Sequence, residues 1–404
     1  MTDGSGPGTP TMGAVEAAPA PYLPLGGVKV LDLTRLIVGD LATRQLADLG
    51  AEVVKVEDPV TGDYQRVIPP FVDGVAVWHE LLNRNKKSVA LDILNEHDRD
   101  VILELVDKAD VVVEVSRPGG LLRTGVDLAE CRRRRPSLVV CSISGFGQIG
   151  EWAMLPAHGL NMDGLAGMTE TYEEDGQTRF IQIAYTSFGN ELGALNAALA
   201  VIAALVGARA TGEGVWIDIS CWDCLIDVNR TAIAYLAATG RDVQVDQKTL
   251  WGSKHSLYKA KDGKLVFIAV IERKFWERFC AAIERPDLVD QWESDSSVDY
   301  GSSALRDELE PVMASKTSRE WLDFFLEWGL PGSPMLELED ILKAEHFASR
   351  GLLEWTLDGL GVPNVPSPIR WLDRAGARPG AHPRRAPSVG AHTEEVISSW
   401  LGEG

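Results

Sequence analysis

The sequence predicts an α/β protein in two parts: a large Rossmann-like domain built on a parallel sheet, and a smaller second domain. Short runs of β-branched residues alternate with helical segments in the first half of the chain, which is typical of a parallel sheet covered by helices on both faces. With 404 residues, of which 45% are hydrophobic and 24% charged, the chain can bury sizeable cores. In such a fold, ligands bind beyond the carboxyl ends of the strands.

Strand and helix signals follow one another in order along this first half. Residues 28–33 (VKVLDL) and 51–56 (AEVVKV) are strand-like runs that flank a helical segment at 40–49, and together they predict a βαβ unit. Further strands are expected at 88–91, 111–115, 138–143 and 215–219, with a helix at 99–106 and a buried, Ala-rich helix at 192–208.

The character of the sequence changes after this last strand. Residues from about 227 to 328 indicate helices and a hairpin, with an Asp262-Gly263 turn. Six prolines between 363 and 387 then indicate an extended connection, and a short helix is expected at 393–400. We therefore expect a disordered tail at 1–22, a large domain at 23–225, a small domain at 226–335, and a C-terminal segment at 336–404 that returns to the large domain.

The composition excludes several classes of function. A net charge of −20 repels nucleic acid and anionic membranes, so neither is an expected partner. The apolar stretch at 192–208 is too short and too weakly hydrophobic to span a bilayer, and the N-terminus lacks the pattern of a secretion signal, so we expect a cytoplasmic protein. The arginine run at 132–135 is more typical of a solvated helix end than of an anion site.

The cysteines predict neither disulfides nor a metal site. There are five, an odd number at irregular spacing. The pair in Cys221-Trp-Asp-Cys224 lacks a second Cys or His pair to complete a zinc site, so buried thiols are expected and no metal.

Several motifs, in order, resemble one family. They are PLGGVKVLDLTR (24–35), LADLGAEVVKVE (46–57), LNRNKKSVALD (82–92), ADVVVE (109–114), RPG (117–119), CSISGFG (141–147), TGEG (211–214), DG (262–263), AP (386–387) and HT (392–393). Their succession over about residues 22–400 resembles the class III CoA-transferases, a group that contains formyl-CoA and carnitine CoA-transferases and the α-methylacyl-CoA racemases. The resemblance implies an interlocked dimer in which each chain threads the ring of the other.

The resemblance also implies a site for coenzyme A, present as a substrate. Residues 83–87 (NRNKK) put three cations in one loop, which suits phosphate recognition. On the family pattern the cofactor-binding residues are Arg84, Lys87, Leu91, Ile93, Val115, Ser116, Arg117 and Arg123. The family usually has Glu-Asn-Phe where this chain has Glu114-Val115-Ser116, so one amide contact to the coenzyme is missing.

The position of the family's nucleophile is the main departure. In these transferases an aspartate attacks the acyl-CoA thioester to form a mixed anhydride, and here the matching stretch is FGNELG (188–193), with Asn190 in its place. Three explanations are open: Glu191 acts instead, another group such as Asp163 acts, or the chain is the non-catalytic subunit of a heteromer with a paralogue, as in benzylsuccinate CoA-transferases.

Two further residues match the racemase branch. His158 and Glu272 correspond to its catalytic histidine and the glutamate that supports it, although Gly159 replaces the aspartate beside the histidine. A histidine that merely caps a helix is the alternative. Residues 251–255 (WGSKH) fall where the family has a glycine-rich loop, and one glycine predicts a stiffer loop. The candidate functions are therefore a CoA-transferase acting on an acyl-CoA and a carboxylic acid, a silent structural subunit, or an acyl-CoA racemase or isomerase.

Overall fold

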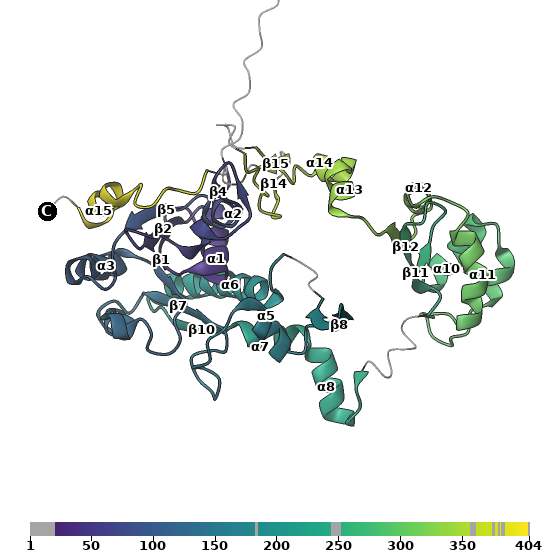
Figure 1. The fold of residues 1–404 in the computed structure, drawn as a ribbon, viewed down its shortest axis with the longest axis horizontal. Helices are drawn as coiled ribbons and strands as arrows, with labels where there is room; N and C mark the ends of the chain where they lie inside the picture. Colours follow the sequence, from purple (N-terminus) through teal and green to yellow (C-terminus); the bar gives the residue numbers. More distant parts are fainter. Residues whose placement is uncertain are drawn as a thin grey trace, which may run out of the picture. The chain divides into compact units, whose positions relative to one another are not determined.

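The computed structural model describes residues 21–181, 185–243, 252–355, 361–373, 376–378, 380 and 384–402. The chain forms two compact units: unit 1 comprises residues 1–228 and 352–404, and unit 2 comprises residues 229–351 (Figure 1). The first division falls close to the boundary expected at 225. Residues 336–351 group with unit 2, whereas we expected them in the returning segment. Most of the expected N-terminal tail lies outside the described residues.

Unit 1 is built on a six-stranded sheet in the order β10-β7-β6-β1-β2-β5, with every neighbouring pair parallel. The order runs outward from β1 in both directions, so a topological switch point lies between β1 and β6, where ligands bind in open α/β sheets. The predicted α/β class is confirmed. The strands are β1 (Lys29–Leu33), β2 (Glu52–Glu57), β5 (Lys87–Ala90), β6 (Val111–Glu114), β7 (Val139–Ser144) and β10 (Trp216–Ser220).

Helices cover both faces of this sheet. Because side chains alternate along a strand, Val111 and Val113 of β6 pack into one core and Val112 packs into the other. The first core contains α1 (Leu36–Asp48), α2 (Val77–Asn83), α5 (Gly159–Leu165), α6 (Phe188–Thr211) and α7 (Cys221–Val228). The second contains α3 (Glu96–Lys108), α4 (Leu128–Arg134) and α15 (Thr393–Leu401).

Helix α6 is buried on one face only, whereas the sequence predicted a buried helix. Its small residues, such as Ala194 and Ala197, pack against α1, β7 and α7, while Leu195, Leu199 and Val206 are 54, 64 and 65% exposed. Among the described residues it is the one helix long and apolar enough to cross a membrane, with 33% of the apolar window buried. Its buried face makes it a core helix of unit 1.

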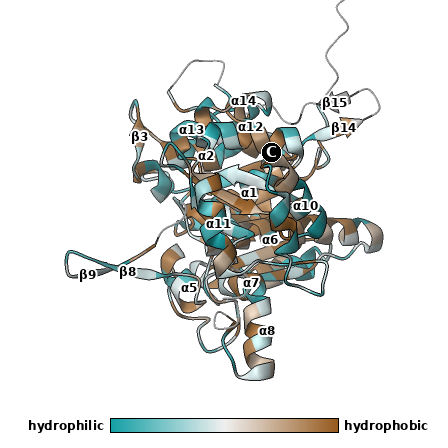
Figure 2. Ribbon diagram, turned by 90° about the vertical axis from the view of Figure 1, so that its right-hand side faces the viewer, coloured by the Kyte–Doolittle hydropathy of each residue, from teal (hydrophilic) through white to brown (hydrophobic). Residues whose placement is uncertain are grey.

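The described residues of unit 1 also form three short hairpins and two 3-10 turns. Figure 2 shows the β8–β9 hairpin projecting from the α/β body, and all of its strand residues are exposed. The strands are β3 (Phe71–Val72), β4 (Val75–Ala76), β8 (Thr171–Glu174), β9 (Gln177–Phe180), β14 (Trp371–Asp373) and β15 (Gly376–Arg378), and the turns are η1 (Tyr64–Val67) and η2 (Leu122–Thr124).

Unit 2 has its own core around a small antiparallel sheet. The predicted hairpin is present: β11 (His255–Lys259) pairs with β12 (Leu265–Ala269), which pairs with β13 (Gly332–Pro334). Trp276, Phe279 and Trp321 are fully buried beneath it. The helices of this unit are α8 (Arg230–Thr239), α10 (Arg273–Ala282), α11 (Ser303–Met313), α12 (Ser318–Trp328), α13 (Leu338–Lys343) and α14 (Glu345–Ser349), with the 3-10 turn η4 (Pro286–Asp290).

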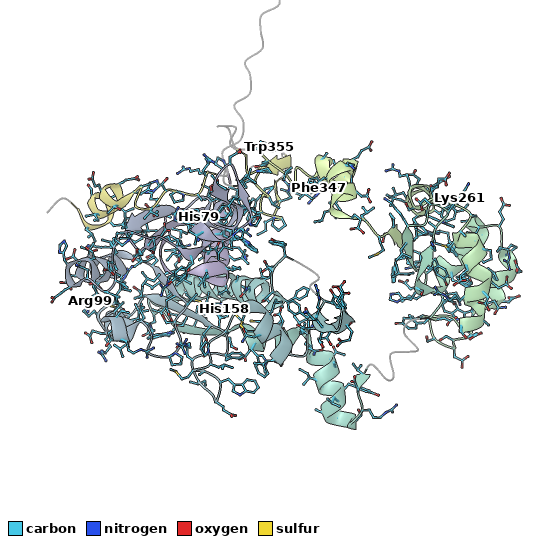
Figure 3. The ribbon with its side chains drawn as sticks, in the orientation of Figure 1. His79, Arg99, His158, Lys261, Phe347 and Trp355 are labelled. Atoms are coloured by element: carbon cyan, nitrogen blue, oxygen red, sulfur yellow. The ribbon has the colours of Figure 1, made fainter. Side chains whose placement is uncertain are left out.

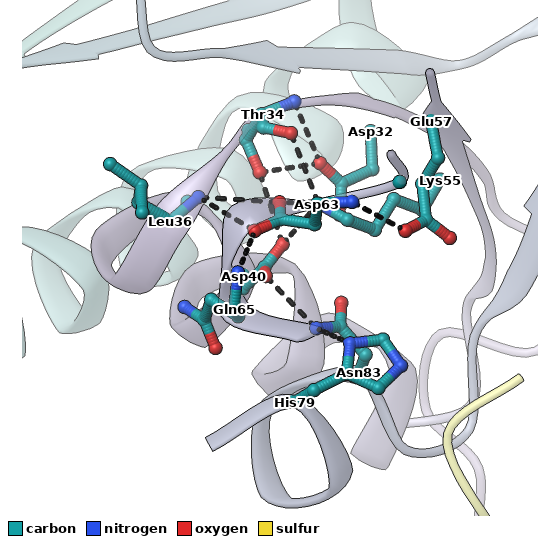
Figure 4. A network of polar contacts seen from close by, with 12 residues as sticks. Asp32, Thr34, Leu36, Asp40, Lys55, Glu57, Asp63, Gln65, His79 and Asn83 are labelled. Carbon is teal, nitrogen blue, oxygen red and sulfur yellow. Dashed lines mark hydrogen bonds and ion pairs between the residues drawn. The ribbon is translucent and has the colours of Figure 1, made fainter. Parts of the chain in front are cut away.

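A buried group of charges, the Lys55 cluster, joins the carboxyl ends of β1 and β2 to α1 (Figure 4). We define it as Asp32, Asp40, Lys55, Asp63 and Lys86. The Lys55 ammonium lies 2.5 Å from an Asp40 oxygen and 3.0 Å from an Asp63 oxygen. The Lys86 ammonium lies 3.1 Å from an Asp32 oxygen. Removing one partner from such a cluster leaves an uncompensated buried charge, which destabilises a protein by about 3–5 kcal/mol.

The charges of this cluster, together with burial, shift the pKa values of its members. Burial alone would raise the pKa of the Asp32 carboxyl, but Lys55 and Lys86 outweigh burial and hold that pKa below its ordinary value. Burial would lower the pKa of Lys55, yet the surrounding carboxylates raise it. The pKa of Asp40 is raised because burial outweighs the attraction of both lysines.

A second buried group fixes the C-terminal return to the edge of the sheet. Arg66 donates to both Glu57 oxygens at 2.8 and 2.7 Å, and the Ser88 hydroxyl donates to Glu57 at 2.6 Å. Burial alone would raise the pKa of Glu57, but these hydrogen bonds hold it at about 2. Arg66 also donates to the Pro387 carbonyl at 2.9 Å. His79 lies beside this group, where burial, together with the Arg66 charge, lowers its pKa to about 4.

The depressed pKa of His79 predicts acid-sensitive stability. Because the folded protein holds this imidazole neutral down to about pH 4, the unfolded chain, with a pKa near 6.5, binds the proton first. The free energy of unfolding of unit 1 should therefore fall as pH drops from 6.5 towards 4, by roughly 3 kcal/mol for this group alone. Urea unfolding at a series of pH values measures this.

The variant His79→Gln should flatten this part of the pH curve, because its amide does not titrate. The matched change at His346, which is exposed on α14, should leave the curve as in the wild type. Parallel curves for wild type and His79→Gln would contradict the assignment.

Candidate active site

A cavity of about 870 Å³ opens in unit 1 at the carboxyl ends of the strands. Five strands supply its walls with the residues at or just beyond their ends: 33–38 after β1, 56–58 at β2, 91–94 after β5, 115–117 after β6 and 143–145 at β7. The cavity therefore straddles the switch point between β1 and β6, where a parallel sheet binds ligands.

Eight of the residues singled out from the sequence line this cavity. They are Leu91, Ile93, Val115, Ser116, Arg117, Arg123, His158 and Asn190. Within the described part of the chain, neither arginine is paired with a carboxylate. Arg117 donates to the Met154 carbonyl at 2.8 Å, and Arg123 to the Pro118 carbonyl at 3.4 Å. Both guanidinium groups therefore keep their charge and most of their donors for a ligand.

Arg84 and Lys87 do not line the cavity, in contrast to the phosphate-binding role expected for them. Arg84 is 2% exposed and donates hydrogen bonds to both carboxylate oxygens of Asp48, at 3.1 and 2.6 Å. Lys87 pairs with Glu52 at 2.6 Å and with Glu395 at 2.9 Å.

Their loop instead joins the main body of unit 1 to its C-terminal segment. Arg84 donates to the Val365 carbonyl at 2.5 Å, and the Asn85 side chain accepts the Arg384 backbone N–H at 2.7 Å. The side chains of Arg84 and Lys87 are therefore used in ion pairs with carboxylates of other elements, and these ion pairs hold unit 1 together.

Asn190 lies in the first turn of α6 with its side chain on the cavity wall and 9% exposed. Ser187 caps this helix and accepts the Asn190 N–H at 3.1 Å. Asp163 accepts the backbone N–H groups of Phe188 and Gly189 at 3.1 and 2.9 Å. These bonds give Asp163 a structural role as a second cap, which argues against it as the replacement nucleophile.

Gly159 allows α5 and α6 to approach closely at this point. A Cβ atom there would lie 2.5 Å from the Ser187 Cβ and 3.0 Å from the Asn190 amide nitrogen. No side chain fits without a shift of the α6 terminus. The aspartate that the racemase branch carries beside its histidine therefore has no room in this arrangement.

His158 stands at the start of α5 and lines the cavity (Figure 3). Its backbone N–H donates to the Asn161 side chain at 2.6 Å. The cap of the helix is thus made by Asn161 and the His158 backbone. The imidazole, which is exposed, lies on the cavity wall where it could hold or move a proton.

Glu191 does not line the cavity with these residues, and Glu272 lies in the other unit. Glu191 follows Asn190 but does not line the cavity, and it interacts with the charge of Arg44 on α1. Glu272 belongs to unit 2, where it precedes α10 and pairs with Lys274 at 2.8 Å. The structure therefore offers Glu191 no direct approach to a ligand in the cavity of unit 1.

The described part of the expected loop at 251–255 is anchored in unit 2; Trp251 lies outside the described residues. Lys254 is fully buried, with its ammonium 2.5 Å from Asp299, 2.8 Å from the Gln291 carbonyl and 4.4 Å from the Trp276 ring centre. A buried ion pair and an aromatic face therefore hold this segment in unit 2, and the stiffness of the loop stays a prediction.

Two cavity residues lie within the family motifs, but the sequence analysis gave them no role at the site. Arg35, between β1 and α1, is exposed on the cavity wall and contacts the Tyr64 ring at 5.5 Å. Ser144, at the end of β7, is 7% exposed, and its hydroxyl has no hydrogen-bond partner among the described residues. Both lie at carboxyl ends of strands, which is the signal that could have identified them.

The cysteines and the arginine run have structural roles. Cys221 is buried at the cavity floor, where burial raises the pKa of its thiol to about 12. Within the described ranges, no group of three or more His, Cys, Asp or Glu side chains is placed to hold a metal. Of the arginine run, Arg134 pairs with Asp107 at 2.9 Å and Arg135 with Asp110 at 3.1 Å, as expected for a solvated helix end.

Known proteins resemble this chain along almost its whole length. An acetyl-CoA:oxalate CoA-transferase of Acetobacter aceti is 30% identical over 371 residues, covering 91% of this chain and 94% of that protein. The α subunit of a succinyl-CoA–L-malate CoA-transferase of Chloroflexus aurantiacus is 28% identical over 396 residues, covering 94% and 89%. A crystal structure of a CaiB/BaiF family protein from Brucella suis superposes with a TM-score of 0.76 at 26% identity, covering 94% of this chain and all of that one.

The sequence profile of CoA-transferase family III matches residues 25–393, which include every strand and helix around the cavity up to the start of α15. The profile and the relatives agree with the family indicated by the ordered motifs. This chain therefore belongs to CoA-transferase family III.

Proposed function

We propose that this protein transfers CoA between an acyl-CoA and a free carboxylic acid, and that it does so as a dimer or within a two-subunit complex. The observation that carries the proposal is the cavity itself, which combines an apolar wall, two arginines without carboxylate partners, and the Asn190 and His158 side chains. The apolar residues Leu91 and Ile93 suit a flat adenine, and Arg117 and Arg123 suit the phosphates.

The acid substrate is proposed to be a short dicarboxylic acid. The relatives described above are named for the acids oxalate and L-malate, which carry two carboxyl groups each, and the second is also named for succinyl-CoA, which keeps one free carboxylate beside its thioester. A second carboxylate gives a binding site a charge to recognise that a simple fatty acid lacks.

The second candidate function is that of a silent subunit. An amide is a far weaker nucleophile than a carboxylate, so Asn190 favours a chain that binds CoA while a paralogous partner supplies the aspartate. The name of the Chloroflexus relative, an α subunit, gives a precedent for two-subunit enzymes in this family. Purification from the native host, followed by mass spectrometry of whatever co-purifies, tests this alternative directly.

The third candidate, a racemase or isomerase, is supported least. Such an enzyme moves a proton beside the thioester and needs bases on both faces of that carbon. His158 supplies one, but an amide at position 190 does not supply the other.

The CoA assignment predicts that Arg123→Ala weakens binding of CoA by about 1–3 kcal/mol, because a charge-assisted contact to a phosphate is lost. Isothermal titration calorimetry with CoA measures this. Arg134→Ala, which removes an exposed arginine of α4, should leave the affinity unchanged. If neither the wild-type chain nor its complex with a partner binds CoA, the ligand assignment fails.

The nucleophile position predicts a gain of chemistry on Asn190→Asp. The substituted side chain has the same shape and lines the same wall, so it should form an anhydride with acyl-CoA that hydroxylamine converts to a hydroxamate on residue 190. The wild type should trap nothing there. Mass spectrometry of the digested protein reads the result.

Asn196→Asp is the matched control, because it adds a carboxylate to the exposed side of the same helix. It should give no hydroxamate. If the pure wild-type protein transfers CoA robustly and Glu191→Gln abolishes this transfer, Glu191 is the nucleophile. That result would also contradict the silent-subunit alternative.

The dimer is proposed from the family resemblance and supported by α6. Leu195, Leu199 and Val206 leave an apolar stripe on this helix exposed, and such a stripe is typical of an interface. Leu199→Glu should not affect folding of one chain but should shift the protein to monomer in light-scattering measurements. Val60→Glu, at a position 91% exposed, should stay dimeric. A stable wild-type monomer would rule out the dimer.

A further inference from the structure

We propose that Arg117 is a positioning residue that links coenzyme binding to the loop that precedes His158. One donor of its guanidinium group holds this loop, and the other donors face a ligand in the cavity. The inference rests on the proposed function, because it takes CoA as the ligand. It adds a response of the protein to that ligand.

The loop in question is formed by residues 145–157, which join β7 to α5 and contain neither helix nor strand. Its two ends touch, because a Cβ atom on Gly145 would lie 2.3 Å from the Ala157 Cβ. Its middle is a surface segment, in which Ile149 and Met154 are 84 and 53% exposed. A loop with close ends and few buried side chains is typical of a segment with low local stability.

The carboxyl end of this loop belongs to the cavity. Residues 155–157 and the next residue, His158, line the cavity wall. The backbone N–H of His158 is held by the Asn161 side chain at 2.6 Å, so the imidazole starts from a fixed point. The wall beside it, at 155–157, depends instead on what holds the middle of the loop.

Two contacts hold the middle of the loop. The Trp152 ring packs edge-on against Trp222 of α7, with the ring centres 5.4 Å apart. Arg117 donates a hydrogen bond to the Met154 carbonyl at 2.8 Å. Among the described residues, this is the one hydrogen bond that joins residues 149–157 to another element of the chain.

The backbone that carries Arg117 is itself fixed. The buried Glu114 carboxylate accepts the Ser116 N–H at 2.5 Å, and the Gln148 side chain donates to the Ser116 carbonyl at 2.9 Å. The Arg117 carbonyl accepts the Gly120 N–H at 2.7 Å. Arg117 therefore reaches the loop from a backbone that the end of β6 holds in place.

The guanidinium group can hold the loop and bind a phosphate at the same time. It has five N–H donors in one rigid plane, and the bond to Met154 comes from its Nη1 atom. A phosphate that accepts two parallel hydrogen bonds from another edge fixes this plane. Because the same plane carries the donor to Met154, coenzyme binding strengthens the hold on the loop and steadies the wall beside His158.

Hydrogen exchange measured by mass spectrometry on the full-length protein, with and without CoA, tests this link without turnover. The amides of Ala153 and Leu155 donate hydrogen bonds within the loop, to the Gly150 and Trp152 carbonyls at 3.3 and 2.8 Å. We expect saturating CoA to slow exchange at these two amides about two- to tenfold, the effect of one ordinary hydrogen bond. The measured quantity is the change that CoA causes, which a merely structural role of Arg117 would not produce.

Arg117→Gln, measured at a CoA concentration that saturates the variant, should show no such slowing, because the planar fork is lost. Arg117→Lys keeps the charge without the fork, so it should bind CoA more tightly than Arg117→Gln and show an intermediate slowing. Arg123→Gln is the matched control. Arg123 lines the same cavity but donates to the Pro118 carbonyl, outside the loop, so this variant saturated with CoA should keep the wild-type slowing.

The inference is overturned if the wild type binds CoA without slower exchange at residues 153 and 155, or if the slowing persists in Arg117→Gln. An equal loss of slowing in Arg123→Gln would also overturn it, since CoA would then act on the loop by another route. Calorimetric titration of the same samples separates these results from a failure of the proposed function, which follows if neither the wild-type chain nor its complex with a partner binds CoA.

Discussion

The buried ammonium of Lys55 is the constraint on which the cavity depends. It lies in contact with Asp40 and Asp63, and through them it links the end of β2, the first turn of α1 and the turn before η1. Charges without water are stable only when each has its partner, so these segments hold one another in a single arrangement. The Asp63 carboxylate that pairs with Lys55 also accepts the N–H of Leu36 at 3.3 Å, where the backbone has a φ of +65°.

Polar contacts also fix the start of helix α6, which contributes Asn190 to the cavity wall. Its first turn is capped by Ser187 and by Asp163 on α5, which fixes the direction in which Asn190 faces the cavity. Further along, Gly193 lets the helix pack directly on Cys221 of α7, since a Cβ atom there would lie 2.6 Å from the sulfur. The cavity residue Cys221 and the buried face of α6 therefore belong to one packed core.

The fold was predictable because the pattern of hydrophobic residues along the chain indicates which side chains are buried. Valine-rich runs that are buried on both faces can be recognised as inner strands of a parallel sheet, and the structure confirms them at β1, β2, β6 and β7. The hydrophobic pattern of the sequence does not show which charged side chains form ion pairs in the fold. Arg84 and Lys87 form a basic loop in the sequence, but their carboxylate partners, Asp48 and Glu52, come from α1 and β2.

The changes around Asn190 are physically connected. The family resemblance implies a carboxylate at position 190 and another beside the histidine, and these two positions meet where Gly159 touches the start of α6. Carboxylates placed that close would repel one another and raise each other's pKa. An amide at 190 and no side chain at 159 remove that repulsion and permit the tight α5–α6 contact seen here. Asn190 thus places a neutral amide on the cavity wall, which also carries the charged side chains of Arg35, Arg117 and Arg123.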